Sequence, residues 1–256
     1  MTDPASPREV AAAWLPQLPG TRAPRDVPDA IVEPDWGGTR VVAALTRDEA
    51  ALYAHGEEVA APEELLQALL TAFTAFGAMS AGDAVIEGHL TTAVLRSDEG
   101  AYPALPRAER PPFLIPRAFR QGAKDDPFIR ARDHVSRAQA METATLVALP
   151  RGEPHAFVAT DLLWLDGQSL VAFPLLERKR HLASVLEESH LVRVTVFVRP
   201  STVATLVAWG TLGLRDLSYR AANSRYLPGV ANPDWAIGTA PDSPARAPKP
   251  RTTPTP

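Results

Sequence analysis

Apolar and polar positions alternate along parts of the chain, and this alternation predicts strands. The clearest stretch is 192–198, in which valine occupies every second position and other residues fall between. A period of two places the valines on one face of a strand. Further strands are expected at shorter apolar runs, over 41–45, 50–53, 84–95, 143–149 and 156–165.

Helical spacing marks three other stretches. The first begins at Pro62, where proline followed by two acids suits the first turn of a helix. Its apolar stripe is predicted to end at Gly77 and to consist of Leu66, Leu69, Leu70 and Phe73. A second helix is expected over 175–189 and a third at about 200–208. In the second helix, three cationic residues are predicted to face water: Arg178, Lys179 and Arg180.

Composition limits the classes of protein that fit this pattern. The 256 residues are 45% hydrophobic and 22% charged, which is typical of a globular domain with a substantial core. The absence of cysteine excludes disulfides and thiolate metal sites. No apolar run approaches the ~20 residues of a membrane span, and the polar start does not resemble a signal peptide. We therefore expect a cytoplasmic protein without membrane contact.

Proline marks both ends of the chain and suggests three regions. Residues 1–29 are rich in proline and show little apolar periodicity, so a loose N-terminal extension is expected there. Residues 240–256 are also rich in proline and lack core-forming residues, which predicts a disordered tail. The globular domain is expected over 30–239.

One short motif carries the main chemical information. Residues 33–40 read Glu-Pro-Asp-Trp-Gly-Gly-Thr-Arg. This run resembles the signature Glu-Pro-Lys-x-Asp-Gly-x-Arg of ATP-dependent DNA ligases and related nucleotidyltransferases. In that family the lysine becomes covalently adenylated, whereas this chain has Asp35 at the position. The following acid of the signature is replaced by Gly37.

The resemblance continues downstream. Residues 85–90 look like the strand-borne Asp-Gly-Glu motif, with Glu87 as the first acid and His89 in place of the second. Residues 157–167 and 174–178 resemble a ligase run closely and form the most specific match. In this run Thr160 occupies the position of the family's aromatic residue that stacks on adenine, so one flat apolar face is lost.

The last matches lie near the end of the chain. Residues 215–220 fall where the family has Glu-Gly-x-x-x-Lys, and Arg220 takes the place of that lysine. Arg is not equivalent to Lys at a phosphate site. Residues 223–229 match a Ser-x-Tyr-x-Pro-Gly turn, and residues 234–238 match a tryptophan-lysine element without its lysines. The resemblance therefore covers about residues 30–238 in the correct order.

The resemblance implies the fold of the DNA ligase and mRNA capping enzyme nucleotidyltransferases. This is an α+β, ATP-grasp-like fold with mostly antiparallel sheets and flanking helices. An OB-fold domain usually follows in such ligases, and none is expected here. The residues that match the family are those that build turns, strand ends and core: Pro34, Trp36, Gly38, Gly88, Asp161, Leu162, Leu163, Gly167, Pro174, Tyr226, Gly229 and Trp235. The residues that differ from the family are those that the resemblance places in contact with ATP.

The nucleophile has no evident substitute in the sequence. The chain has three lysines, Lys124, Lys179 and Lys249, and none lies in the first hundred residues. Covalent nucleotidyl transfer by this route needs an amine of lowered pKa held against the α-phosphate. A carboxylate at position 35 would instead repel a triphosphate, by about 3 kcal/mol for one charge pair at ~5 Å and an effective dielectric constant near 20.

Candidate site residues follow from the same motifs. Glu33, Arg40, Glu87 and Arg220 are expected to line a remnant of the nucleotide pocket, with no catalytic residue at position 35. The segment 107–137 is rich in arginine with interleaved phenylalanines, which suits either a DNA backbone or a solvated face. The predicted phosphate contacts are Arg117, Arg120, Arg220 and Arg225. The six histidines show no metal-binding spacing, so no metal site is predicted.

These observations predict a DNA ligase-like protein of DNA repair that does not self-adenylate and acts as a DNA-binding or accessory factor. Its expected partners are nicked or damaged duplex DNA and DNA-repair proteins. Two alternatives stay open. One is an active ATP-dependent ligase or nucleotidyltransferase that works with partner proteins or on pre-adenylated ends, with ATP and Mg²⁺ as cofactors. The other is a module that binds only proteins.

Overall fold

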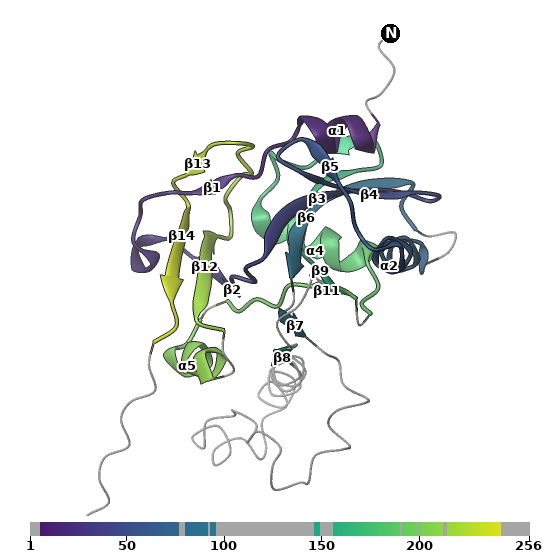
Figure 1. Ribbon diagram of the computed structural model, residues 1–256. Helices are drawn as coiled ribbons and strands as arrows, with labels where there is room; N and C mark the ends of the chain where they lie inside the picture. The colour runs from purple at the N-terminus through teal and green to yellow at the C-terminus, as the bar shows by residue number, and fades with distance from the viewer. Residues whose placement is uncertain are drawn as a thin grey trace, which may run out of the picture.

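Two sheets, one mostly and one fully antiparallel, lie side by side in the computed structural model (Figure 1). The structure describes residues 6–76, 80–91, 93–95, 146–148, 156–189, 191–199, 201–211 and 214–241. The arginine-rich segment 107–137, the expected helix end at Gly77 and the tail from residue 242 lie outside the described residues. Most of the predicted strand over 143–149 lies outside them as well.

The larger sheet has the strand order β10-β9-β6-β3-β4-β5, with β11 added on β9. Its members are β3 (Thr39–Thr46), β4 (Ala50–Ala54), β5 (Glu57–Val59), β6 (Asp83–Thr91), β9 (Ala156–Leu165), β10 (Gln168–Ser169) and β11 (Val192–Val194). All neighbours are antiparallel except β11, which runs parallel to β9. The strands predicted at 41–45, 50–53 and 156–165 are confirmed.

The smaller sheet has the order β14-β12-β2 and is fully antiparallel. It consists of β2 (Ala30–Pro34), β12 (Asp216–Ala221) and β14 (Trp235–Thr239). Two short pairs complete the strands. β1 (Leu18–Pro19) runs parallel to β13 (Ala231–Asn232), and β7 (Ala93–Leu95) is antiparallel to β8 (Leu146–Ala148).

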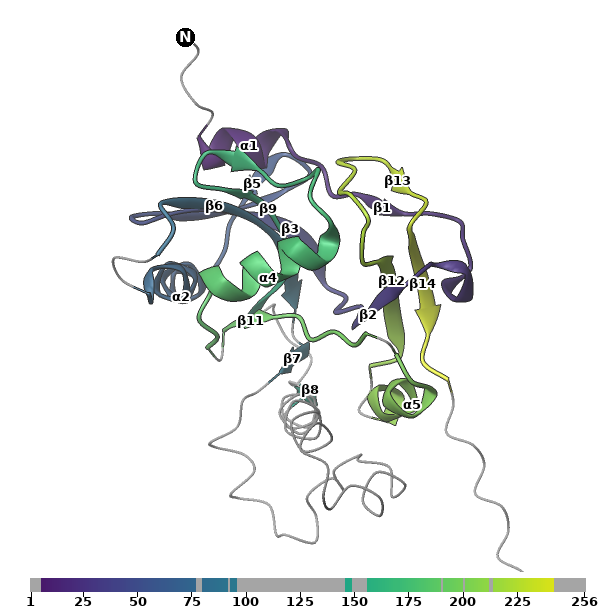
Figure 2. The same cartoon turned by 180° about the vertical axis from the view of Figure 1, so that it is seen from behind.

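Helices cover both faces of the larger sheet, as both views show (Figures 1 and 2). On one face, Leu69 of α2 (Glu63–Thr74) and Leu182 of α4 (Leu175–Val185) share a core with Ala43. On the other face, Ala11 of α1 (Pro7–Ala13) packs with Val42. Alternate residues of β3 thus point to opposite cores, as a period of two requires. Full burial of a side chain such as Leu69 contributes about 1.5–3 kcal/mol.

The smaller sheet has its own helix, α5 (Val203–Thr211), and a short 3₁₀ helix, η1 (Pro24–Asp26). Trp209 of α5 packs against Val32 of β2 and Leu217 of β12. The helix predicted at about 200–208 is therefore present, shifted by three residues toward the C-terminus.

The N-terminal stretch is packed rather than loose over residues 6–29. Ser6 and Glu9 form a capping box that starts α1, with Pro7 at its first position. Ala11 is fully buried against the larger sheet, and Val27 is buried beside the smaller one. The expected loose extension is wrong for these residues because they bury apolar side chains.

The second helix differs from the prediction in its length and in the position of its cations. α4 ends at Val185 rather than at residue 189. Arg178 and Lys179, predicted to face water, are 0% and 3% exposed, whereas Arg180 is exposed as expected. The helical period explains the difference, since 178 and 179 follow the buried Leu175 by three and four positions.

Two glycines, one in the turn before β3 and one in β6, allow close packing of neighbouring chain segments. Gly38 has a φ of 72°, and a Cβ there would lie 2.1 Å from the carbonyl oxygen of Leu90. A Cβ at Gly88 would lie 2.5 Å from the ring of Phe157. Gly38 is required by its positive φ and by the close approach, whereas Gly88 is required by the close approach alone. The turn after β2 and the β6–β9 contact depend on them.

Candidate functional site

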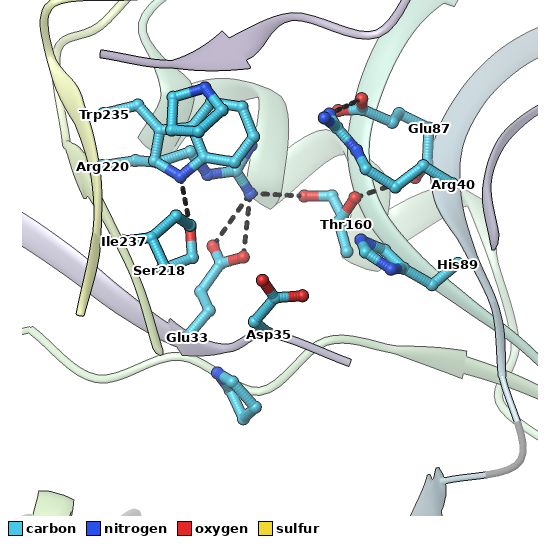
Figure 3. A pocket seen from close by; sticks show the side chains of 12 residues that line it. Glu33, Asp35, Arg40, Glu87, His89, Thr160, Ser218, Arg220, Trp235 and Ile237 are labelled. Carbon is cyan, nitrogen blue, oxygen red and sulfur yellow. Dashed lines mark hydrogen bonds and ion pairs between the residues drawn. The ribbon is translucent and has the colours of Figure 1, made fainter. Parts of the chain in front are cut away.

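A pocket of about 200 Å³ lies between the two sheets (Figure 3). Residues from both sheets line it, because the ends of β2, β12 and β14 face β3, β6 and β9 across the gap. The lining residues are Pro19, Glu33, Pro34, Asp35, Arg40, Glu87, His89, Thr160, Ser218, Arg220, Trp235 and Ile237. The structure thus brings together all four residues predicted for the pocket remnant, with Asp35 among them.

Arg220 is buried at the base of this pocket and is held by two carboxylates. Its Nη2 lies 2.8 Å from Glu33 Oε2, and its Nη1 lies 3.3 Å from Asp161 Oδ2. Nη2 also donates to the carbonyl oxygen of Thr160 at 3.2 Å. Burial alone would lower the pKa of Arg220, but Glu33 and Asp161 raise it. The guanidinium therefore stays charged and committed to protein partners.

Asp161 also receives a second arginine from α4. Arg178 donates to it twice, from Nε at 2.8 Å and from Nη2 at 2.9 Å, and both side chains are fully buried. Nη1 of Arg178 donates to the carbonyl oxygens of Phe173 and Ser224. Burial alone would raise the pKa of Asp161, but Arg178 lowers it. This bidentate pair fixes α4 to β9 beneath the pocket.

Lys179 is the site residue that the sequence analysis missed. Its ammonium forms an ion pair with Glu33 and donates to the carbonyl oxygen of Thr160 at 2.7 Å. Both carboxylate and ammonium are buried, and burial lowers the pKa of Lys179 to about 8. A lysine distant in sequence thus lies behind the strand that leads to Asp35. Lys179 lies four residues after Leu175 and three before Leu182, and this helical spacing was the signal that its side chain points toward the core.

Asp35 itself is half-buried and faces the pocket (Figure 3). Its backbone N–H donates to the carbonyl oxygen of Asp216 at 2.8 Å, and its Oδ1 accepts from the N–H of Gly37 at 3.2 Å. Within the described part of the chain, no cationic side chain forms an ion pair with this carboxylate. Asp35 therefore adds a negative charge to the pocket wall.

Arg40 and Glu87 form the opposite wall. They make an ion pair, and Glu87 also accepts from the hydroxyl of Tyr226 at 3.0 Å. Arg40 Nη1 donates to the carbonyl oxygen of Gln17 at 2.7 Å. Burial, aided by the charge of Glu87, raises the pKa of Tyr226 well above its ordinary value. Arg40 is thus held on both sides by protein acceptors.

A histidine and an indole complete the lining. His89 lies with Nδ1 2.8 Å from the carbonyl oxygen of Gly37, and burial lowers its pKa. The imidazole is therefore neutral near pH 7. Trp235 donates from Nε1 to Ser218 at 2.7 Å, and the guanidinium carbons of Arg40 and Arg220 lie 5.0 and 5.9 Å from its ring centroid. Thr160, by contrast, offers no ring; its hydroxyl donates to the carbonyl oxygen of Glu87.

Acids and bases balance around the pocket. Four cationic groups, Arg40, Arg178, Lys179 and Arg220, meet four carboxylates, Glu33, Asp35, Glu87 and Asp161. The formal charges therefore cancel when His89 is neutral. A pocket of this kind has no excess positive charge with which to attract a polyphosphate.

The predicted phosphate contacts are separated by the structure. Arg117 and Arg120 lie outside the described residues. Arg220 is buried in ion pairs, so a contact between this residue and DNA would require these pairs to break. Arg225 is exposed, and in the described ranges no acid is paired with it. Of these four residues, Arg225 is the one placed where a phosphate could reach it.

The described residues contain neither a cluster of metal ligands nor a membrane-spanning helix. No set of three or more histidine, aspartate or glutamate side chains in the described ranges is arranged to hold a metal ion. Among the helices of the described residues, none is both long and apolar enough to cross a membrane.

Solved structures resemble this chain in fold. The ligase domain of M. tuberculosis LigD matches with a TM-score of 0.53 and 18% identity, over 88% of this chain and 59% of that chain. A mycobacterial DNA ligase D complexed with ATP and MES matches with a TM-score of 0.52 and 17% identity, over 89% and 60%. This chain thus spans about three fifths of the length of either structure. No protein-family model and no curated protein matches the sequence.

The shared fold is that of the ligase domain of these DNA ligases, as the resemblance of the sequence motifs implied. The mixed α/β architecture with a curved antiparallel sheet agrees with that expectation. Because the sequence identity is below one fifth, the likeness establishes a shared fold and nothing further.

Proposed function

We propose that this chain is a DNA ligase-like protein that does not adenylate itself and acts as a DNA-binding or accessory factor in DNA repair. One observation carries the proposal. Asp35 lies in the pocket at the position where the resemblance puts the nucleophilic lysine, and no cation within the described residues neutralises it. A carboxylate there lacks both the reach and the charge of the amine.

The electrostatics of the pocket support this reading. A triphosphate would have to take Arg40 from Glu87 and Arg220 from Glu33 and Asp161. Removing one partner of a buried ion pair costs several kcal/mol, on the order of 3–5. Asp35 adds repulsion of about 3 kcal/mol for each phosphate charge at ~5 Å. Both effects oppose the binding of ATP in a reactive position.

Lys179 favours a second candidate, an active nucleotidyltransferase with a relocated nucleophile. Its amine has a pKa lowered to about 8 by burial, and Glu33 lies in contact to take up the proton. Two contacts argue against this candidate: the same Glu33 and the carbonyl oxygen of Thr160 hold the ammonium behind the pocket wall. Lys179 is also absent from the lining residues.

One experiment separates the two candidates. The purified chain is incubated with α-labelled ATP and either Mg²⁺ or Mn²⁺, and label is sought after denaturing electrophoresis, with an active ligase as positive control. We expect no covalent label. Label on the chain would overturn the proposal, and its loss in Lys179→Met but not in Asp35→Asn would establish the second candidate.

The accessory role in DNA repair rests on the ligase fold and on the exposed Arg225. Both the DNA and the protein partners of this role are proposals. A gel-shift titration with nicked and intact duplex, over a range of salt concentrations, tests the DNA half. Binding to phosphates must weaken steeply as salt rises.

A further inference from the structure

Residues 14–20, which follow α1 and contain β1, cross from the larger sheet to the smaller one (Figures 1 and 2). We call these residues the N-terminal strap. Backbone hydrogen bonds tie it down along its length. The N–H of Gly229 donates to the carbonyl of Leu15 at 2.9 Å, and the N–H of Gly20 donates to the carbonyl of Trp235 at 2.8 Å. Pro19 of the strap lines the pocket.

Gln17 is the anchor of the N-terminal strap. This polar side chain is 1% exposed, and its Oε1 accepts from the N–H of Leu227 at 3.2 Å and from Nδ2 of Asn232 at 3.0 Å. A buried amide oxygen with two donors fixes its position closely. The β1–β13 pairing contributes only two residues on each strand, so the two side-chain hydrogen bonds of Gln17 add substantially to the backbone hydrogen bonds that hold the strap.

The backbone of Gln17 also belongs to a closed ring of hydrogen bonds with the pocket wall. Its carbonyl accepts from Arg40 at 2.7 Å, and its N–H donates to the hydroxyl of Tyr226 at 3.1 Å. Tyr226 in turn donates to Glu87, which pairs with Arg40. Strap, β3, β6 and the turn at Tyr226 are therefore linked in one cycle, and displacement of the strap breaks two of its four contacts.

We propose that the N-terminal strap is the closing element of the pocket, with Gln17 as the residue that positions Arg40. While the strap is anchored, Arg40 stays on Glu87 and Pro19 closes one side of the pocket. When the strap dissociates from the two sheets, Arg40 loses its hydrogen bond to the Gln17 carbonyl oxygen, and the side chains that line the pocket become accessible to solvent. This inference goes beyond the proposed function and does not rest on it, because it concerns access to the pocket and not its chemistry.

The chain contains no cysteine, which allows a clean accessibility test. Thr160→Cys puts a single thiol in the pocket floor, at a side chain that is 7% exposed, with little change in size. Its reaction rate with iodoacetamide reports the population of the open state, provided that the pocket closes faster than the thiol reacts. Gln17→Met in this background keeps the length of the side chain and removes its acceptor oxygen.

We expect the thiol at position 160 to react about tenfold faster with Gln17→Met, as the loss of one or two buried hydrogen bonds would give. Gly20→Ala displaces the strap by a second route, since its Cβ would lie 2.5 Å from the carbonyl oxygen of Asn232. It should have the same effect. If one variant fails to fold, the other still tests the proposal.

Two controls distinguish strap release from other causes. Thr39→Cys carries an exposed thiol outside the pocket lining, whose rate should not respond to Gln17→Met. Leu69→Ala destabilises the core on α2 and should leave the rate at position 160 unchanged. An unchanged rate in both strap variants would overturn the proposal, and so would an equal rise with Leu69→Ala. The assay contains no nucleotide, so its outcome is independent of the labelling experiment.

Discussion

The ammonium of Lys179 and the carboxylate of Glu33 form an ion pair in which both side chains are almost completely buried. Glu33 stands two residues before Asp35, so the chain places an ammonium close to the position at which the resemblance expects one. The ammonium is nevertheless almost completely buried, and Lys179 is not among the residues that line the pocket. Its charge neutralises Glu33 and is not presented to the pocket, which makes Lys179 a structural cation in this arrangement.

The first prediction concerns pH. Burial lowers the pKa of Lys179 from 10.5 in an exposed lysine to about 8. Between these values the unfolded chain binds more protons than the folded one, so the free energy of unfolding rises with pH. The gain from pH 8 to pH 10 is on the order of 2 kcal/mol. Above pH 10 the raised pKa of Tyr226 acts in the opposite direction, because the folded state then binds more protons.

Urea unfolding at pH 7.5, 9 and 10 measures this effect. The matched control is Lys179→Met, in which the rise should vanish because no amine titrates at this position. A wild-type protein whose unfolding free energy is flat or falls between pH 8 and 10 would contradict the lowered pKa of Lys179.

The second prediction concerns Asp161. Asp161→Asn removes the carboxylate that holds both Arg178 and Arg220, and leaves two buried guanidiniums without it. We expect a loss of about 3–5 kcal/mol in the free energy of unfolding. Chemical denaturation measures it. The exposed pair of Arg180 and Glu177 supplies the control, because Glu177→Gln should change stability by less than about 1 kcal/mol.

The third prediction concerns the charge at position 35. Since the carboxylate of Asp35 repels phosphate, Asp35→Asn should strengthen the non-covalent binding of ATP, and Asp35→Lys should strengthen it further. For the lysine variant we expect at least about a tenfold change, well below the upper bound of about 6 kcal/mol for a full reversal of charge at ~5 Å. Equilibrium dialysis with labelled ATP gives the three affinities. Any other order among them would show that this charge does not govern access of the nucleotide.

The fourth prediction separates two arginines that the sequence treated alike. Arg225→Ala should weaken binding to nicked duplex and reduce the slope of log affinity against log salt by about 1, as loss of one phosphate contact requires. Arg220→Ala should instead lower the unfolding free energy, because Glu33 and Asp161 lose a buried partner. Arg25→Ala is the control, since Arg25 is highly exposed but lies on η1. Equal effects of Arg25→Ala and Arg225→Ala on DNA would refute a specific role for Arg225.

The sequence predicted the fold where local periodicity and tertiary packing agree. β3, β4 and β9 follow apolar runs, and α2 follows its proline start. Its predicted apolar stripe is right for Leu69 and Phe73, whereas Leu66 and Leu70 are only partly buried and Leu65 is buried instead. The order of the ligase-like motifs along the chain indicated how the strands are arranged in one fold, which no local pattern shows. The α1 helix was missed although Ser6, Pro7 and Glu9 carry a capping signature. The high proline content of residues 1–29 predicted a loose extension instead.

The strand predicted over 192–198 shows how tertiary context overrides a regular pattern. β11 pairs with β9 only over Val192–Val194, although the valine alternation continues. Beyond this point the chain leaves β9 and crosses to the smaller sheet, where Val198 bridges to Val32. A period of two indicates an extended chain, but it does not say which neighbour the chain joins.

The sequence predicted that four of the lining residues lie together, but it did not predict their ion-pair and hydrogen-bond partners. Glu33, Arg40, Glu87 and Arg220 were brought together by motif order. Their partners were not visible in the sequence, because Gln17, Asp161 and Lys179 come from other parts of the chain. The interpretation of Lys179 as a surface residue came from its charge, since lysine is almost never fully buried unless it is paired. Its helical spacing from Leu175 and Leu182 pointed inward, but its counter-ion Glu33 could not be recognised from the sequence.

The crossing from β11 to the smaller sheet has a mechanical consequence. Val32 and Val198 exchange two backbone hydrogen bonds, and Trp36 donates from its indole to Thr195 at 2.8 Å. These contacts fasten the two sheets to each other along the edge where the chain passes between them. If the space between the sheets widens, this edge therefore acts as the hinge, and the opposite edge undergoes the largest displacement.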